Sequence, residues 1–405
     1  GFADCADYVR QTHGPDFLGA INASSATCPT DLTLLSSSLY QSEGETVAVF
    51  FSVDHRLSER WRLAGGLRWT EDEKLLLTQR ADIIGDFIGG GVPVAFTFET
   101  PLADPHSWDA LIGHVSASYS PSESVLAYGR VSTGYRAGGF QGIDARALGD
   151  YIEEEELVNY ELGLKGLFLE NRLLLTTGVF LNDYDGFQLN GFQRAPPGRE
   201  ALGPIPGWPF LEYTANIDGT RVWGFEAEAT LLAGEAWRLS GHYTYLDSEI
   251  GDHEFIVFGD PEVASERVIV VVPGFGEFPV DVPEPTALGG KQLPQQPNHK
   301  AALVVEYEAP IGNAGSLHLY TSLSYTGERF PNVANVKRQT LDPYMRWDAR
   351  ASWRPQDARW ECDAFVQNLT DEIGLREFNP AIRVNPAMGR LTEPRRVGLS
   401  IRYRL

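Results

Sequence analysis

Several features that define other protein classes are missing from this sequence of 405 residues. No stretch of about 18 uncharged apolar residues occurs, so a helical membrane span is excluded. Basic residues are scarce, with 33 Lys and Arg against 55 Asp and Glu, and the net charge is −22. Because phosphate binding needs a basic surface, nucleic acid is not expected as a partner.

Sequence signatures of catalysis are missing as well. The chain contains no G-x-S-x-G elbow, no P-loop, no dinucleotide fingerprint and no HExxH pair. Its 8 His are scattered, which leaves no metal site with ordinary ligand spacing. We therefore predict that the protein is not an enzyme and that it holds neither a metal nor a cofactor.

The residues that are plentiful favour strands and turns over helices, with 41 Gly, 25 Pro, 16 Tyr and 9 Trp beside only 2 Met. The C-terminal segment Arg395 to Leu405 shows the pattern most clearly, because apolar and polar side chains alternate along it. Three arginines on the inner side of a dry soluble sandwich would be costly to bury, so a water-filled interior suits the segment better. The apolar side consists of Val397, Leu399, Ile401, Tyr403 and Leu405, and the polar side includes Arg396, Arg402 and Arg404.

The same alternation recurs along the chain and predicts about thirteen strands. Short turns near residues 55, 121, 169, 233, 312 and 356 alternate with long polar segments. Transmembrane barrels have short turns at one rim and long loops at the other, whereas a soluble sandwich has no reason to sort its connections. The sequence therefore predicts an all-β, antiparallel transmembrane barrel. The predicted strands cover 46–54, 61–70, 111–119, 125–133, 157–168, 172–190, 213–231, 237–245, 300–309, 316–326, 344–354, 359–368 and 395–405.

The first part of the chain differs from the rest. Residues 1–45 are rich in Gly, Asn, Ser and Asp without a sustained period, and we predict an extracellular loop there, followed by a partial barrel domain over 46–405. Cys5 and Cys28 in this segment are candidates for a disulfide, with two unrelated thiols as the alternative. An odd number of strands does not close a bacterial single-chain barrel, so further strands are expected outside this sequence.

Several local motifs together resemble one family. Each is weak alone, but in this order they resemble the signatures of the TonB-dependent outer-membrane receptor barrel, and Tyr128 to Gly142 resembles the siderophore-type members. The resemblance implies a plugged barrel of the 22-stranded class, of which this chain would be the last thirteen strands, without the plug domain. The motifs are Asn159 to Gly166, Asn182 to Asn190, Gly219 to Glu228, Gln367 to Glu372 and Glu393 to Leu405.

This resemblance implies a receptor in the Gram-negative outer membrane that takes up a scarce nutrient, with a ferric siderophore as the expected ligand. Haem, cobalamin and an oligosaccharide remain open as ligands. The implied partners are the TonB complex through the missing N-terminal region, lipopolysaccharide and outer-membrane lipids, and the barrel-assembly machinery. The alternative from another class is a secreted, soluble all-β protein that binds a ligand or a glycan.

The segment from Gly134 to Gln141 is the best candidate for ligand contact. Tyr135 and Phe140 offer aromatic faces, Arg136 offers a forked donor for carboxylate or catecholate oxygens, and Gln141 offers an amide. The glycines of the segment would let the backbone approach a ligand closely. In the alternative interpretation, these glycines only permit a strand to turn at the rim.

Overall fold

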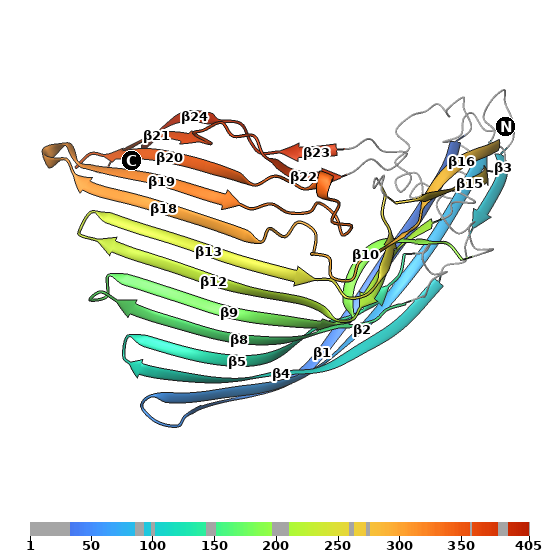
Figure 1. The fold of residues 1–405 in the computed structure, drawn as a ribbon, viewed down its shortest axis with the longest axis horizontal. Helices are drawn as coiled ribbons and strands as arrows, with labels where there is room; N and C mark the ends of the chain where they lie inside the picture. The colour runs from blue at the N-terminus through green and yellow to red at the C-terminus, as the bar shows by residue number, and fades with distance from the viewer. Residues whose placement is uncertain are drawn as a thin grey trace.

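The computed structural model describes residues 33–85, 93–98, 102–142, 151–196, 210–258, 263–272, 276–356, 359–379 and 388–404. Thirteen strands pair antiparallel in chain order, and β3 adds to β2 at its far end. Among these residues β1 and β24 do not pair with each other, so the sheet is an open, curved trough (Figure 1). The strands are β1 (Thr33–Arg56), β2 (Trp61–Gly85), β3 (Pro93–Phe98), β4 (Leu102–Ser122), β5 (Val125–Arg136), β8 (Glu155–Phe168), β9 (Leu173–Asp185), β12 (Thr220–Ala233), β13 (Trp237–Glu249), β18 (His299–Pro310), β19 (Ser316–Thr326), β20 (Tyr344–Arg354), β21 (Trp360–Gln367) and β24 (Arg396–Tyr403).

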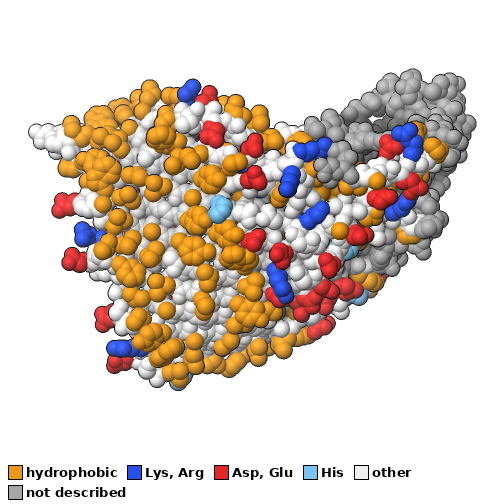
Figure 2. Space-filling model, viewed as in Figure 1, with side chains coloured by type: hydrophobic (Ala, Val, Ile, Leu, Met, Phe, Trp, Pro, Cys, Tyr) orange, Lys and Arg blue, Asp and Glu red, His pale blue; other side chains and the backbone are white. Residues whose placement is uncertain are grey.

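The register of the sheet places the apolar positions of successive strands on one face. Side chains alternate between faces, so directly paired residues share a face across the whole sheet. The resulting apolar rows are exposed, with 59% of Val115 and 64% of Leu162 accessible, and Figure 2 shows apolar side chains gathered over the main sheet. This confirms the predicted alternation. One row runs through Val53, Gly65, Val115, Val131, Tyr160, Leu181 and Trp223.

The opposite face of the sheet is polar and carries paired charges. Arg62 contacts Asp54 at 2.6 Å near the first short turn, and Arg402 contacts Glu361 at 3.1 Å near the C-terminal end. A polar face on the concave side of a trough whose other face is apolar has the polarity of a transmembrane barrel wall.

Aromatic rings on this inner face lie over glycines of the neighbouring strand. Tyr128 is paired directly with Gly163, and a Cβ at Gly163 would lie 2.4 Å from the Tyr128 ring. The same arrangement joins Phe180 to Gly224 and Phe365 to Gly398. None of the three glycines has a positive φ, so backbone conformation does not require glycine there. Glycine is required because a Cβ would collide with the ring.

Short turns and long connections are segregated to opposite ends of the sheet (Figure 1). The long connections form a second layer that contains a four-stranded sheet in the order β11–β10–β14–β17. No helix among the residues described has the length and the apolar character needed to cross a membrane. The elements of this layer are β6 (Gly139–Phe140), β7 (Tyr151–Ile152), β10 (Phe187–Arg194), β11 (Phe210–Ile217), β14 (Glu254–Ile256), β15 (Ser265–Val272), β16 (Gly276–Pro283), β17 (Pro285–Ala287), β22 (Leu375–Asn379) and β23 (Met388–Leu391).

The buried core of the molecule lies in this loop layer, because the outer face of the main sheet is exposed. Phe255 and Ile217 are each 1% exposed and Leu288 is fully buried. They pack with residues of the segment after β19, including Ala334 and Val336. The long loops are therefore held together by their own hydrophobic core.

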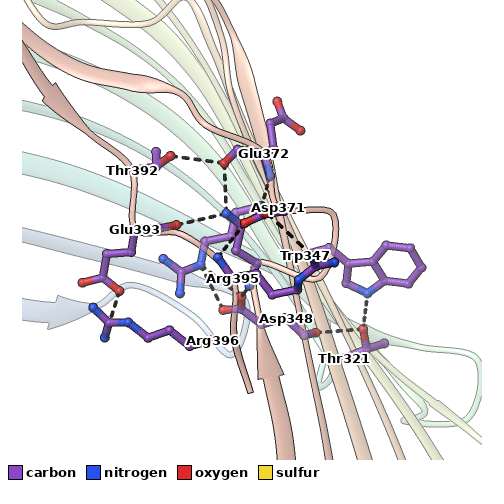
Figure 3. A network of polar contacts seen from close by, with 11 residues as sticks. Thr321, Trp347, Asp348, Asp371, Glu372, Thr392, Glu393, Arg395 and Arg396 are labelled. Atoms are coloured by element: carbon purple, nitrogen blue, oxygen red, sulfur yellow. Dashed lines mark hydrogen bonds and ion pairs between the residues drawn. The ribbon is translucent and has the colours of Figure 1, made fainter. Parts of the chain in front are cut away.

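The segment that follows β21 fixes the position of the last strand (Figure 3). The Asn368 side chain is 2% exposed, and its amide nitrogen donates to the carbonyl oxygens of Glu372 at 2.9 Å and Glu393 at 3.0 Å. Asp371 accepts a hydrogen bond from the backbone N–H of Arg395, directly before β24. One of the motifs that carry the family resemblance thus ties the end of β21 to the start of β24.

Several sequence-based boundaries need correction. The predicted strands 61–70 and 111–119 are parts of longer strands, since β2 runs to Gly85 and β4 begins at Leu102. The strand β1 begins at Thr33, so residues 33–45, which were predicted as loop, pair with β2. The predicted strand 172–190 breaks at Gly186, which has φ +64°, and the strand 213–231 breaks at Gly219, which has φ +74°. These breaks let β10 and β11 leave the main sheet as a pair of their own. Residues 1–32, with Cys5 and Cys28, lie outside the described residues, so their disulfide stays a prediction.

Candidate functional site

The loop predicted to contact a ligand follows β5 at the long-loop end of the sheet. Tyr135 and Arg136 are the last residues of β5 and pair with Glu156 and Glu155 of β8. Phe140 lies in the short strand β6, which pairs with β7. The structure therefore brings the four candidates into one region, but their side chains have different surroundings.

Gln141 is held by the protein. Its side chain is 6% exposed. The amide nitrogen donates to the carbonyl oxygen of Thr214 at 2.6 Å, and the amide oxygen accepts from the backbone N–H of Thr214 at 3.0 Å. These two bonds attach the loop after β5 to the edge of β11, so Gln141 is occupied in positioning the loop.

Phe140 belongs to an aromatic cluster. Its ring lies 5.9 Å from that of Trp108 and 5.8 Å from that of Tyr151, and His106 stacks on Tyr151 at 4.0 Å. Gly138 lies against this cluster, because a Cβ there would be 2.2 Å from the Trp108 indole nitrogen. At Gly138, the close approach that the glycine permits is therefore to Trp108 and to the backbone of Ile152.

Tyr135 also points into the protein. Its hydroxyl is buried without a well-formed hydrogen bond among the described residues. Tyr135 therefore faces the interior of the protein and not open space.

Arg136 is the candidate that faces open space. Its side chain is 65% exposed, and its guanidinium lies 3.9 Å from the carboxylate of Glu155, which is itself 12% exposed. Arg136 lines a cavity of about 690 Å³ between the end of β5, the short strand β7 and the four-stranded sheet of the loop layer. A forked cation at the edge of a cavity is suited to carboxylate or other anionic oxygen ligands.

The cavity combines apolar walls with a few polar groups. The aromatic residues Phe192, Phe255 and Phe258 line it, with Pro294 and Pro331 from two further loops. The polar members of its lining are Arg136, Gln188, Asn190, Glu212, Thr214 and Asn332. A cavity of this kind binds a ligand through shape and apolar contact and orients it through a small number of hydrogen bonds.

The polar residues that support the cavity are fixed by hydrogen bonds. The Gln188 amide nitrogen donates to the carbonyl oxygens of Glu153 at 2.9 Å and Ala137 at 3.3 Å. Its backbone N–H donates to Glu155 at 2.7 Å. Gln188 therefore connects the loop that carries Arg136 to the start of β8, which limits the movement of Arg136.

A half-buried pair lies behind the cavity wall. The Tyr213 hydroxyl and the His253 ring nitrogen are 2.7 Å apart, and Phe255 packs against both rings. Burial raises the pKa of Tyr213 to about 12 and lowers the pKa of His253, in each case because the charged form is disfavoured. Both side chains are therefore neutral at pH 7.

Sequence analysis identified Arg136 but missed most of the cavity. Its walls come from β10, β14 and residues 331–333, which are far apart in the chain. The run Phe255 to Phe258 is apolar and could have been recognised as a buried segment within a long polar loop. Nothing in the sequence indicates that this run faces Arg136, because that depends on how separate loops pack.

The chain is similar to known proteins in both sequence and structure. The family model described as "TonB dependent receptor-like, beta-barrel" matches residues 2–369. The "Probable TonB-dependent siderophore receptor PiuA" of Acinetobacter baumannii is 22% identical over 381 residues, which are 92% of this chain and 42% of that protein.

Solved structures show the same fold. The ferric yersiniabactin uptake receptor FyuA from Yersinia pestis aligns with a TM-score of 0.65 and 18% identity, over 91% of this chain and 47% of that one. The siderophore receptor PiuA from Acinetobacter baumannii aligns with a TM-score of 0.61 and 19% identity, over 90% of this chain and 44% of that one. This chain therefore spans less than half the length of these relatives.

Proposed function

Since the chain belongs to the TonB-dependent receptor-like β-barrel family, a family of the outer membrane, we propose that it forms part of a receptor that takes up a ferric siderophore. The observation that carries the proposal is the set of exposed apolar rows that cross the sheet on one face only. Such a surface is stable against lipid, while the polar face lines a wet interior.

The ligand class is supported by two further observations. Relatives over most of this chain are described as siderophore receptors, and one is described as a ferric yersiniabactin uptake receptor. The cavity beside Arg136 offers a cation and aromatic walls at the long-loop end of the sheet. Ferric siderophores present anionic oxygen groups on a partly apolar body, which this combination suits.

The mechanism that we propose is capture at the loop layer followed by passage along the polar face. This mechanism involves no bond chemistry, and the candidate residues would serve recognition only. Energy would come from the TonB complex through the N-terminal part of the complete receptor. Lipopolysaccharide and outer-membrane lipids would surround the apolar face, and the barrel-assembly machinery would act on the C-terminal strands.

A test uses the complete receptor in cells that lack their own ferric siderophore receptors. We expect uptake of a radiolabelled ferric catecholate that disappears when TonB is deleted. Arg136→Gln is expected to reduce binding of the complex about tenfold, since a charge-assisted hydrogen bond is lost. Arg194→Gln, which removes an exposed ion pair with Glu266 in the same layer, is the matched control and should have no effect.

Two results would contradict the proposal. Equal binding by the Arg136→Gln variant and the wild type would remove Arg136 from the site. A monodisperse protein that needs no detergent and shows no TonB-dependent uptake of any ferric complex would favour the soluble binding protein instead.

A further inference from the structure

The outward face of the sheet contains an apolar hollow of about 800 Å³. It crosses β2, β4, β5, β8, β9 and β12, and its floor includes Ala117 and Gly129, which are paired directly across β4 and β5. Larger side chains surround this floor, among them Leu63, Leu162 and Trp223. The hollow exists because two adjacent strands carry small residues where their neighbours carry large ones.

The hollow runs at an angle to the membrane normal. Leu63 lies two residues from the short-turn end of β2, whereas Trp223 lies ten residues from the short-turn end of β12. Its end at Leu63 is therefore close to the short-turn rim, and its end at Trp223 lies about one leaflet further toward the long loops. It follows the direction in which neighbouring strands pair, because directly paired residues line it.

The length of the hollow matches one leaflet of a bilayer. Five steps between neighbouring strands span about 24 Å. With strands tilted by about 45°, this corresponds to roughly 17 Å along the membrane normal. A hydrocarbon core about 30 Å thick gives each leaflet about 15 Å. A single acyl chain can therefore lie along most of the hollow.

The two ends of the hollow differ in the charged side chains beside them. At the long-loop end, the Trp223 indole nitrogen donates to the carboxylate of Asp247 at 3.2 Å, and an anionic headgroup would be repelled there. At the short-turn end, Arg60 directly precedes Trp61, whose ring packs on Tyr119 at 4.8 Å. Arg60 has no ion pair within the described part of the chain, although Glu59 is its neighbour in sequence.

From this geometry we propose that the hollow is a binding site for one glycerophospholipid of the leaflet on the short-turn side. One acyl chain lies over Ala117 and Gly129, and the phosphate lies near Arg60, beside the aromatic pair Trp61 and Tyr119. Bulk lipid is as apolar as this surface, so preference for the site comes from close packing in the hollow and from the phosphate contact. The site is separate from the cavity beside Arg136, and the inference depends on membrane placement but not on the identity of the ligand.

The test measures lipid retained by the complete receptor after purification in a mild maltoside detergent. Palmitoyl-oleoyl-phosphatidylethanolamine is added, and the bound molecules are counted by native mass spectrometry. We expect one retained molecule per receptor. Ala117→Leu, which fills the hollow, should reduce retention about threefold or more, because the chain loses its close contacts. Arg60→Gln should reduce it by a similar factor without changing the hollow.

The matched control is Ala227→Leu, which adds the same bulk at an outward position outside the hollow and should leave retention unchanged. Heat-modifiable gel migration checks that every variant is folded, and Arg60→Gln tests the proposal even if Ala117→Leu does not fold. Equal retention in wild type, Ala117→Leu and Arg60→Gln would overturn the proposal. Retention of lipid A instead of phospholipid, or of a second copy of the chain over the hollow, would also overturn it.

Discussion

At the scale of single residues, the inner face depends on where glycine is placed. Tyr128, Phe180 and Phe365 each pack closely against a glycine of the next strand, where a Cβ would lie within 2.7 Å of the ring. The Tyr128 hydroxyl also donates to Glu161 at 2.5 Å. Sequence analysis placed these aromatic residues in strands, but it did not identify their partners, because the partner of a strand residue depends on register.

Replacing one of these glycines tests the packing. Gly163→Ala would place a Cβ 2.4 Å from the Tyr128 ring, and we expect it to destabilise the protein by about 1–3 kcal/mol through overpacking. Gly178→Ala is the control, since Gly178 is paired directly with Gly163 and a Cβ there is 3.6 Å from its nearest neighbour. The midpoint of heat-modifiable gel migration measures both. The same midpoint for the two variants would contradict the packing argument.

At the scale of elements, the strands of the main sheet were predictable and the loop layer was not. Alternation identified thirteen strands, and thirteen strands pair in order along the sheet. It could not show that Gly186 and Gly219 break two long segments, since glycine is also common within barrel strands. The sheet formed by β10, β11, β14 and β17 has short strands from distant loops, so no single stretch carries its pattern.

The contacts of Asn368 offer a test of how the last strand is held. Asn368→Ala removes three hydrogen bonds of a buried side chain. It also places alanine at φ +52°, a backbone conformation that asparagine tolerates better. We expect a loss of about 2–3 kcal/mol and faster proteolysis next to β24. Gln356→Ala, which removes one exposed bond of 3.4 Å, should change neither. Unchanged protection of β24 in Asn368→Ala would show that strand pairing alone positions it.

The loop sheet should also respond to pH. Burial lowers the pKa of His253 in the folded state, so the unfolded state binds a proton more readily. Stability of the loop layer is therefore full above the ordinary pKa of about 6.5 and falls as the pH is lowered through it.

Hydrogen exchange of β14 at pH 7.5 and pH 5 measures this effect, after correction for intrinsic rates. We expect weaker protection at the lower pH in the wild type. His253→Gln removes the titrating group and should show little difference between the two conditions. Equal protection of the wild type at both pH values would mean that His253 does not control this layer.

At the scale of the whole molecule, the polarity of the two faces of the sheet indicates what surrounds each face. Val397, Leu399 and Ile401 are 77%, 83% and 70% exposed, as expected for a strand whose apolar side chains face lipid. Alternation and the sorting of connections were enough to predict this architecture. The ligand was not predictable to the same degree, because it depends on loops whose packing the sequence does not specify.

A matched pair of substitutions on one strand tests this assignment. Val179 points outward and is 46% exposed, and Thr176 points to the inner face of the same strand. Val179→Arg should cost about 2–4 kcal/mol in a membrane, whereas Thr176→Arg should cost about 0–1 kcal/mol. Unfolding in urea from lipid vesicles measures both. If Val179→Arg were as stable as the wild type, the outer face would be in contact with water.

The location of the hydrophobic core, in the loop layer and not beneath the main sheet, affects which substitutions the protein can accept. A residue such as Leu303, which is 45% exposed on the outer face and lies outside the hollow, faces fluid hydrocarbon that adapts to any apolar shape, so valine, phenylalanine or methionine should serve equally well there. Phe255 and Leu288 are enclosed by rigid neighbours, so a change of volume at either cannot be absorbed. Tolerance to mutation should therefore be greater in the membrane-facing wall than in the loops above it. In most proteins the loops tolerate substitution better than the strands that they connect.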